Sequence, residues 1–308
     1  MIPLPSPQQL RYLLALAEHQ HFGRAAQACA VTQSTLSAGI LMLEHQLDAE
    51  ILDRGIGKRV VFTALGRDLV ERARMAMAAL QDVVEAAVSA HAPMSGPLRL
   101  GIIPTISPFL LPRLMPQLRA AFPHLRLFLR EDTTPRLIER LRDARLDVLV
   151  LALPCDCTRA EVLPVARDRF LVALPPGHLL ATRTEVPAAA LAAESLLLLE
   201  DGHCLRDQAL AACGLLAAPD GEHEADFAAT SLHTLVQMVA GGLGLTLLPE
   251  LAVAGGVTAG ADLVLRPLGG EGAWRTIGLA WREGASRGAD YRALAPVIAA
   301  ALSGGLPT

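Results

Sequence analysis

The stretch FGRAAQACAVTQSTLSAGILMLEHQ, residues 22–46, decides the fold of the amino-terminal part of the chain. Its first eight residues predict a short helix, the next two a tight connection, and Thr32 is a good cap for a longer helix over residues 33–46. The inward face of that longer helix is marked by apolar residues at helical spacing, Leu36, Ile40 and Leu43. A short helix, a turn and a longer helix are the outline of a helix-turn-helix DNA reader.

The segments on either side of this stretch extend the same unit. Residues 7–19 predict a preceding amphipathic helix, and residues 54–66 predict a small β-wing. The wing carries three basic residues, Arg54, Lys58 and Arg59. Residues 63–90 form one long, alanine-rich helical pattern, which is best explained as a pairing surface between two chains.

A hinge and a different architecture follow. Residues 91–97 hold two prolines and a glycine, and from residue 98 onward strand and helix patterns alternate. The predicted strands are 98–103, 125–129, 147–153, 170–173, 196–199, 245–248, 263–265 and 276–280. The predicted helices are 110–122, 134–143, 203–212, 231–240 and one after residue 289. This alternation predicts an α/β ligand-binding architecture with two lobes.

Composition bears on where the protein is expected to act and on how strongly it is expected to bind DNA. The chain has 308 residues and a net charge of -4, and residues 1–92 carry 8 Lys+Arg against 9 Asp+Glu, so the predicted DNA reader is not basic. We see no signal peptide and no uninterrupted apolar run of membrane-spanning length, so we expect a cytoplasmic protein without a membrane partner. The five cysteines should rest there as thiols, and any disulfide should be transient and functional.

The amino-terminal residues resemble the signature of the LysR-type family. The matching positions are Phe22, Arg24 to Ala26, Val31 to Ser34, Leu36, Ser37, Ile40, Leu43, Glu44, Leu52, Arg54, Thr63 and Gly66. The resemblance implies an α+β multi-domain fold: a winged helix-turn-helix over residues 1–66, a linker helix over 63–92, and a two-lobed, periplasmic-binding-protein-like regulatory domain over 97–308. It also implies a homo-oligomer, a tetramer built as a dimer of dimers, that works with RNA polymerase on double-stranded DNA.

A second resemblance narrows the function. The segment LEDGHCLRDQALAAC, residues 199–213, is similar to the redox segment of the hydrogen peroxide-sensing members of the family. Residues 103–105, 131–134, 229–232 and 275–279 resemble the same members. This implies a regulator of antioxidant genes, an activator, in which Cys204 is oxidised and joined reversibly to Cys213, and which glutaredoxin or thioredoxin resets. No metal, no organic cofactor and no enzymatic turnover are implied.

The chemistry of this segment can be argued from its residues. Asp201 or Gly202 is placed to cap a helix whose first turn holds Cys204, where the backbone amides favour a thiolate. A thiolate attacks a peroxide oxygen and becomes a sulfenic acid, which a second thiol converts to a disulfide. Nine helical residues separate Cys204 from Cys213 by roughly 13 Å and place them on opposite faces. A disulfide needs Cα atoms within about 7 Å, so the helix must unwind.

The resemblance implies roles for further residues. Thr105 and Thr134 would supply hydroxyls to the peroxide site, His203 would help shape it, and Arg275 would contribute positive charge. Asp207 belongs to the same motif, with a proposed role in supporting disulfide formation, and Arg206 would add charge beside Cys204.

DNA contacts are expected from the longer helix and the wing. The candidates for base edges are Gln33, Ser34, Thr35 and Ser37. The three basic wing residues would lie at phosphates or in the minor groove. The chain departs from the family's common pattern at Gly39, Leu41 and Met42, where polar or basic residues are frequent. Low non-specific affinity for DNA is one consequence, and packing of Leu41 and Met42 on the dimer or linker helix is the alternative.

Other interpretations stay open beside these. The chain could be a LysR-type regulator that binds a small organic effector between the lobes, a solute-binding protein, or a peroxidase. Cys204 and Cys213 could be inert core thiols, His203 a packed histidine, Thr105 and Thr134 helix caps, and Arg275 a surface or ion-pair residue. Cys29 fits a small core residue. Cys155 and Cys157 could bind a metal or modulate redox chemistry, but two ligands make a poor site, and incidental thiols are favoured.

Overall fold

The computed structural model describes residues 3–53, 60–91, 93–213, 228–270 and 272–303. Contacts divide the chain into two compact units, residues 1–90 with 142–144 and residues 91–141 with 145–308. Each unit has its own buried apolar core. Among the described residues, no helix is long and apolar enough to cross a membrane.

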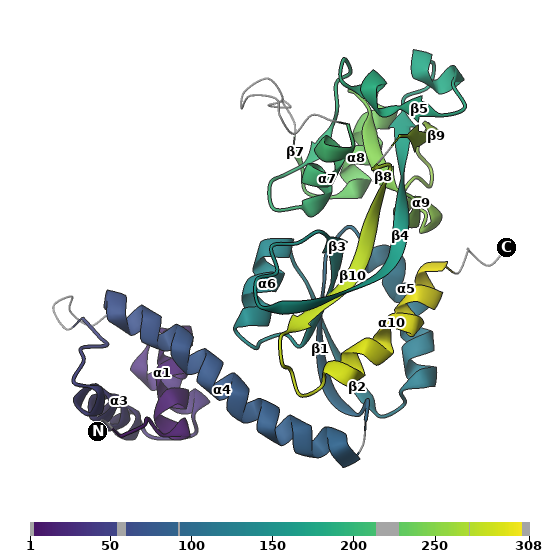
Figure 1. The fold of residues 1–308 in the computed structure, drawn as a ribbon. Helices are drawn as coiled ribbons and strands as arrows, with labels where there is room; N and C mark the ends of the chain where they lie inside the picture. Colours follow the sequence, from purple (N-terminus) through teal and green to yellow (C-terminus); the bar gives the residue numbers. More distant parts are fainter. Residues whose placement is uncertain (1–2, 54–59, 92, 214–227, 271, 304–308) are drawn as a thin grey trace. The chain divides into compact units, whose positions relative to one another are not determined.

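Helices dominate the described part of the first unit (Figure 1). They are α1 (Pro7–His19), α2 (Phe22–Ala28), α3 (Gln33–Leu47) and α4 (Ala64–His91). As predicted, the Thr32 hydroxyl accepts a hydrogen bond from the amide of Thr35 and caps α3. A bridge between Leu52 and Phe62 marks the base of the wing. The predicted wing residues Arg54, Lys58 and Arg59 lie outside the described residues.

The departure at Gly39 has a packing reason. A Cβ atom at this position would lie 2.6 Å from Cδ2 of the buried Tyr12 ring on α1. The glycine therefore lets α1 and α3 approach closely, and a larger residue would force the aromatic ring out of the core. Gly39 is thus required for the packing of α1 on α3, independently of any contact that α3 makes with DNA.

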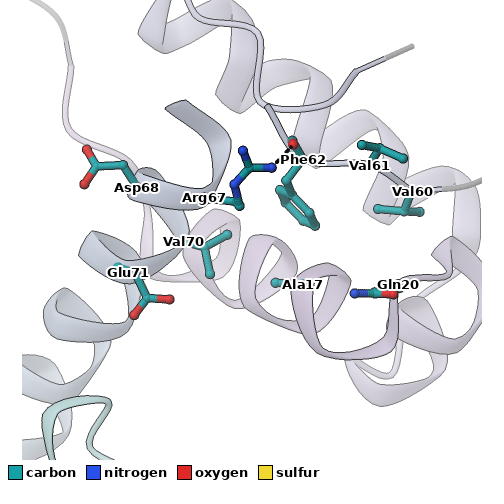
Figure 2. A pocket seen from close by; sticks show the side chains of 9 residues that line it. All are labelled: Ala17, Gln20, Val60, Val61, Phe62, Arg67, Asp68, Val70 and Glu71. Carbon is teal, nitrogen blue, oxygen red and sulfur yellow. Dashed lines mark hydrogen bonds between the residues drawn. The ribbon is translucent and has the colours of Figure 1, made fainter. Parts of the chain in front are cut away.

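A surface pocket of about 530 Å³ lies in the first unit where α1, the strand after the wing and α4 meet (Figure 2). Its lining is Ala17, Gln20, Val60, Val61, Phe62, Arg67, Asp68, Val70 and Glu71. The Arg67 guanidinium donates to the Phe62 carbonyl (2.8 Å), which ties α4 to the base of the wing. None of these lining residues was predicted to contact DNA or peroxide.

The first lobe of the second unit is built on parallel strands. Its elements are β1 (Gly96–Ile102), α5 (Ser107–Ala121), β2 (Leu125–Glu131), α6 (Thr134–Arg142), β3 (Val148–Leu153), β10 (Trp274–Arg282) and α10 (Gly288–Ser303). β1 pairs in parallel with β2 and β3, while β10 pairs antiparallel with β3. Helix α6 covers one side of this sheet, and α5 and α10 pack together on the other (Figure 1). The near-continuous apolar run of β3 is buried as predicted.

The second lobe shares its longest strand with the first. β4 (Ala160–Leu174) pairs with β10 over its first ten residues, and its last part pairs with β8 and β9. The other elements are η1 (Leu179–Thr182), β5 (Val186–Pro187), η2 (Ala188–Leu191), β6 (Leu198–Leu199), α7 (Cys204–Ala212), β7 (Ala228–Ala229), α8 (Leu232–Ala240), β8 (Thr246–Pro249), α9 (Glu250–Ala254) and β9 (Val264–Gly269). The predicted two-lobed α/β architecture is confirmed (Figure 1).

The prediction for β4 was too short. The sequence indicated a strand only at residues 170–173, whereas the strand begins at Ala160. Its first nine residues mix charged residues with Pro164 and are mostly half-buried or exposed, so no apolar run marks them. Pairing with the central strand β10 runs along this half of β4 and extends the strand beyond the apolar run that the sequence shows.

Candidate functional site

Cys204 opens helix α7, as the sequence predicted. Its thiol is free and half-buried, and it occupies the first helical position. The predicted cap was wrong by one or two residues: His203, not Asp201 or Gly202, is the N-cap, and its side chain makes no capping hydrogen bond. The Arg206 amide donates to the His203 carbonyl (2.9 Å), and no side chain of the cap residue takes up the other amides of the first turn.

Cys213 stands at the other end of the same helix. It is the C-cap residue, it is a free thiol, and only 5% of its surface is exposed. Burial raises the pKa of its thiol to about 11. Because the whole interval is helical, the two Cα atoms are separated by about 13 Å, as geometry requires. A disulfide between them is excluded in this conformation.

Arg275 lies at the junction of the lobes in a fully polar setting. Its Nε donates to Oδ2 of Asp168 (2.9 Å), and its Nη1 donates to the Thr105 hydroxyl oxygen (2.9 Å). Its Nη2 donates to the Thr105 carbonyl (3.0 Å). Asp168 in turn accepts the amide of Leu251 at the start of α9 (2.9 Å). All three side chains are buried, so Arg275 is an interior ion-pair residue and not a surface one.

The Thr105 hydroxyl can still donate a hydrogen bond. Its oxygen accepts from Arg275, so its own proton is free to donate to another acceptor. Thr105 is not the cap of α5, because Ile106 is the N-cap residue of that helix and contributes no side-chain bond. A hydroxyl that accepts from a buried cation is polarised and becomes a stronger donor.

Thr134 offers a second unused hydroxyl. Its Oγ1 is buried and has no hydrogen-bond partner among the described residues. It begins α6, and the residue before it packs against the approach to α7: a Cβ atom added at Gly202 would lie 3.8 Å from Cβ of Thr133. The start of α6, in the first lobe, and the start of α7, in the second, therefore meet. A buried hydroxyl without a partner is a place where a small polar ligand gains a hydrogen bond.

His203 and Arg206 flank Cys204. The imidazole of His203 is buried, and this burial lowers its pKa, opposed by Glu200, whose carboxylate lies 3.9 Å away. The guanidinium of Arg206 is engaged elsewhere, because its Nε pairs with Asp201 (3.1 Å) and its Nη1 donates to the carbonyl of Leu199. Asp207 is exposed on the outer side of α7.

Sequence reasoning missed two residues of this region. Asp168 anchors Arg275, but it stands in the half of β4 that carried no strand signal. Gln208 lies one helical turn after Cys204, and its Nε2 donates to the carbonyl of Leu153 (3.3 Å). Its Oε1 is buried and finds no partner in the part of the chain that the structure describes. The four-residue spacing from Cys204 was a usable signal, because it places both side chains on one face of α7.

The DNA-reading candidates on α3 lie at its exposed start. Gln33, Ser34 and Thr35 are exposed and Ser37 is half-buried. The hydroxyls of Ser34 and Thr35 both bond to that of Thr32 (2.9 and 2.8 Å), so the cap orients them. One turn further, Leu41 and Met42 are 46% and 66% exposed. Both side chains are thus largely exposed in the described unit, and their packing in a dimer stays a prediction.

Cys155 and Cys157 are joined by a disulfide with Cα atoms 5.2 Å apart. The expectation that all cysteines rest as thiols therefore fails for this pair. Cys29 is free and half-buried against the core of the first unit, as predicted. Among the described residues, no three histidine, cysteine, aspartate or glutamate side chains are grouped as a metal ion would require.

Both parts of the chain match known families. Residues 7–67 match the bacterial regulatory helix-turn-helix protein, lysR family, and residues 91–303 match the LysR substrate binding domain. The chain is 42% identical over 297 residues, 96% of each chain, to the DNA-binding transcriptional dual regulator OxyR of Escherichia coli K12. It is 38% identical to the hydrogen peroxide-inducible genes activator of Haemophilus influenzae, over 94% of this chain and 95% of the other.

Solved structures give the same result. A cysteine-to-aspartate variant of full-length OxyR from Pseudomonas aeruginosa matches with a TM-score of 0.77 and 34% identity, over 96% of this chain and 98% of the other. A cysteine-to-serine variant of OxyR from Corynebacterium glutamicum, with bound hydrogen peroxide, matches with a TM-score of 0.66 and 32% identity, over 98% and 94%.

Proposed function

Because this chain belongs to the LysR family of bacterial transcription regulators and resembles its OxyR members throughout, we propose that it is a hydrogen peroxide-responsive, DNA-binding regulator that Cys204 switches. One observation carries the proposal. The two thiols that would form the switch stand free at opposite ends of one nine-residue helix, so their bonding and the integrity of that helix exclude each other.

The oxidation step uses groups already in place. The Cys204 thiolate attacks one peroxide oxygen, the O–O bond breaks, and the departing oxygen leaves as water after taking up a proton. The Thr105 proton and the Thr134 hydroxyl would hold the two oxygens, and Arg275 acts through Thr105 as a positioning residue. His203, buried with a lowered pKa, adds no positive charge near neutral pH and shapes the wall of the site.

The resolving step requires refolding. The Cys213 thiol must reach the Cys204 sulfenic acid, displace water and form the S–S bond. The last turns of α7 must unwind for this, which removes the hydrogen bond from Gln208 to Leu153 between the lobes. That loss couples the disulfide to the packing of one lobe on the other. Asp207, exposed on α7, is proposed to support this step.

The assembly proposed is a tetramer of two dimers. Helix α4 carries large exposed apolar side chains along its length: Leu65, Met75, Leu80, Val83 and Val84. A single helix with such a face is stabilised by pairing with a second copy, so α4 is the proposed dimerisation surface. The exposed start of α3 would read double-stranded DNA, with Gln33, Ser34, Thr35 and Ser37 at base edges. The wing residues Arg54, Lys58 and Arg59 would lie at phosphates or in the minor groove.

The cellular setting follows from the same proposal. Antioxidant genes would be the targets and RNA polymerase the partner, in the cytoplasm. A dithiol protein such as glutaredoxin or thioredoxin would reduce the disulfide and reset the regulator. No organic cofactor takes part, and the chain would act as a regulator and not as a peroxidase.

The test is to treat the reduced protein with hydrogen peroxide in excess over its thiols, block free thiols at set times and map the cysteines by mass spectrometry. A Cys204–Cys213 disulfide that forms within seconds and is absent in Cys204→Ser supports the proposal. Free thiols at both positions would overturn it and favour a regulator that binds an organic effector between the lobes.

A further inference from the structure

The structure holds two cysteine pairs in opposite states. Cys155 and Cys157 are bonded to each other, whereas Cys204 and Cys213 are both free thiols. Cys155 and Cys157 are half-buried against the core and partly open to solvent. The function proposed above uses only Cys204 and Cys213, so the bonded pair has no assigned part.

The bonded pair lies close to the helix that carries Cys204. It occupies the connection between β3 and β4, and Cys155 follows the last residue of β3, Leu153, by two positions. The Leu153 carbonyl accepts the hydrogen bond from Gln208 (3.3 Å). Two residues of chain span at most about 7 Å. Helix α7 is therefore fastened to the strand end that leads directly into this pair.

Cys204 lies on the same face of α7 as Gln208, which donates the hydrogen bond to Leu153. Residues four apart on a helix are neighbours on one face, so the Cys204 side chain lies beside Gln208. Cys213 lies on the opposite face, about 13 Å along the axis, and is buried. A sulfenic acid on Cys204 thus forms on the side of α7 turned to the β3–β4 connection, and away from Cys213.

We propose that Cys155 and Cys157 are a second redox site, a resolving dithiol that takes oxidation from Cys204. The thiolate of Cys155 attacks the sulfur of the Cys204 sulfenic acid, forms a Cys204–Cys155 disulfide and releases water. The Cys157 thiolate then attacks the sulfur of Cys155 and expels the Cys204 thiolate. In sum one hydrogen peroxide and two thiols give one disulfide and two waters, and Cys204 is restored.

This relay sets the amount of peroxide that must react before the Cys204–Cys213 disulfide forms. The first equivalent of peroxide would oxidise the Cys155–Cys157 dithiol and leave α7 intact, and only the next would drive Cys204 to Cys213 and unwind the helix. The state in the structure, with one pair bonded and the other free, is the product of the first stage. The inference rests on the proposed reaction of Cys204 with peroxide.

The experiment uses the full chain, reduced with a dithiol reagent that is then removed, and titrated with hydrogen peroxide before thiol blocking and mass spectrometry. In Cys213→Ser we expect one equivalent to yield the Cys155–Cys157 disulfide with Cys204 recovered as a thiol. In Cys157→Ser with Cys213→Ser we expect the Cys204–Cys155 disulfide to accumulate. In Cys155→Ser with Cys157→Ser, the dose that completes the Cys204–Cys213 disulfide should fall about twofold. Cys29→Ser, in the other unit, should behave as wild type.

Two results would overturn the relay while leaving the proposed function standing: rapid oxidation of Cys155 and Cys157 in Cys204→Ser, or no Cys204–Cys155 disulfide in the double variant although Cys204 is oxidised. If Cys204 in the wild-type chain does not react at all, the proposed function fails and the relay with it. Unchanged circular dichroism of each reduced variant confirms that its fold is intact.

Discussion

Arg275 on β10 and Asp168 on β4 stand opposite each other in the strand register, joined through Nε and Oδ2 at 2.9 Å. The side chain of Arg275 is 0% exposed and that of Asp168 5%. Through this pair the two strands, the start of α9 at Leu251 and the turn that holds Thr105 are connected. The pair thus fixes the Thr105 hydroxyl at the lobe junction.

Replacement of Asp168 by asparagine should therefore cost both stability and reaction rate. Loss of the carboxylate leaves a buried, uncompensated guanidinium, which typically costs about 3 kcal/mol. Both tryptophans, Trp274 and Trp281, belong to β10, so urea unfolding followed by tryptophan fluorescence reports on this unit. We also expect slower oxidation of Cys204 by peroxide.

A matched control separates the two effects. Asp290 forms a comparable buried pair with Arg287 (3.0 Å) in the first lobe. Asp290→Asn should destabilise the unit to a similar extent and leave the oxidation rate of Cys204 unchanged. Equal slowing in both variants would mean that Asp168 acts only through stability.

Replacement of Thr134 should slow the oxidation of Cys204 without lowering the stability of the unit. Its hydroxyl has no partner within the described ranges, so Thr134→Val removes no hydrogen bond seen there and should leave the unfolding midpoint unchanged or slightly higher. If this hydroxyl binds peroxide, the rate constant for Cys204 oxidation should fall about tenfold, the effect of a lost bond worth about 1.4 kcal/mol. Quenched-flow thiol blocking measures the rate. An unchanged rate constant would remove Thr134 from the site.

Two substitutions of Thr105 test whether its hydroxyl, held by Arg275, takes part in the oxidation of Cys204. Thr105→Ser keeps a hydroxyl that accepts from Arg275 and should retain most of the rate, whereas Thr105→Val removes it. We expect Thr105→Val to slow oxidation about tenfold or more and to destabilise the unit, because Nη1 of Arg275 loses its acceptor. The prediction fails if the valine and serine variants react equally fast.

The sequence was most informative where one rule governs one element. Helical periodicity and the Thr32 cap located α3, and the apolar run located β3, because local capping and burial determine these elements. It was least informative where long-range pairing decides. The role of Asp168 depends on its ion pair with Arg275, which is 107 residues away in the sequence. No local sequence pattern predicts such a long-range partner. The cap of α7 was misplaced because His203 takes the cap position without a capping side-chain bond.

Leu41 and Met42 permit a test of the DNA-facing side of α3. Both side chains are exposed in the described unit. If this face approaches the DNA backbone, the double variant Leu41→Lys with Met42→Lys adds two cations there, and the slope of log affinity against log salt should steepen by roughly 1.8. Fluorescence anisotropy with operator and random duplexes measures the slope. An unchanged slope would show that these side chains lie away from the phosphates.

The pH dependence of the resolving step reveals whether α7 unwinds before or after Cys213 reacts. Only the thiolate of Cys213 attacks, and burial raises the pKa of this thiol to about 11 in the folded helix. Reaction from the folded state would gain about tenfold in rate for each pH unit up to about 11. After unwinding, the solvated thiol regains an ordinary pKa of about 8.5, and the rate levels off above that value.

We expect the early plateau, because the helical separation of about 13 Å forbids bonding before unwinding. The experiment forms the sulfenic acid at neutral pH in Cys155→Ser with Cys157→Ser, which keeps the other pair out of the reaction, and then jumps the pH. The rate of Cys204–Cys213 formation is followed by tryptophan fluorescence and confirmed by thiol blocking. A rate that continues to climb to pH 11 would mean that Cys213 attacks from its buried position, and that the helix opens as a consequence of the bond.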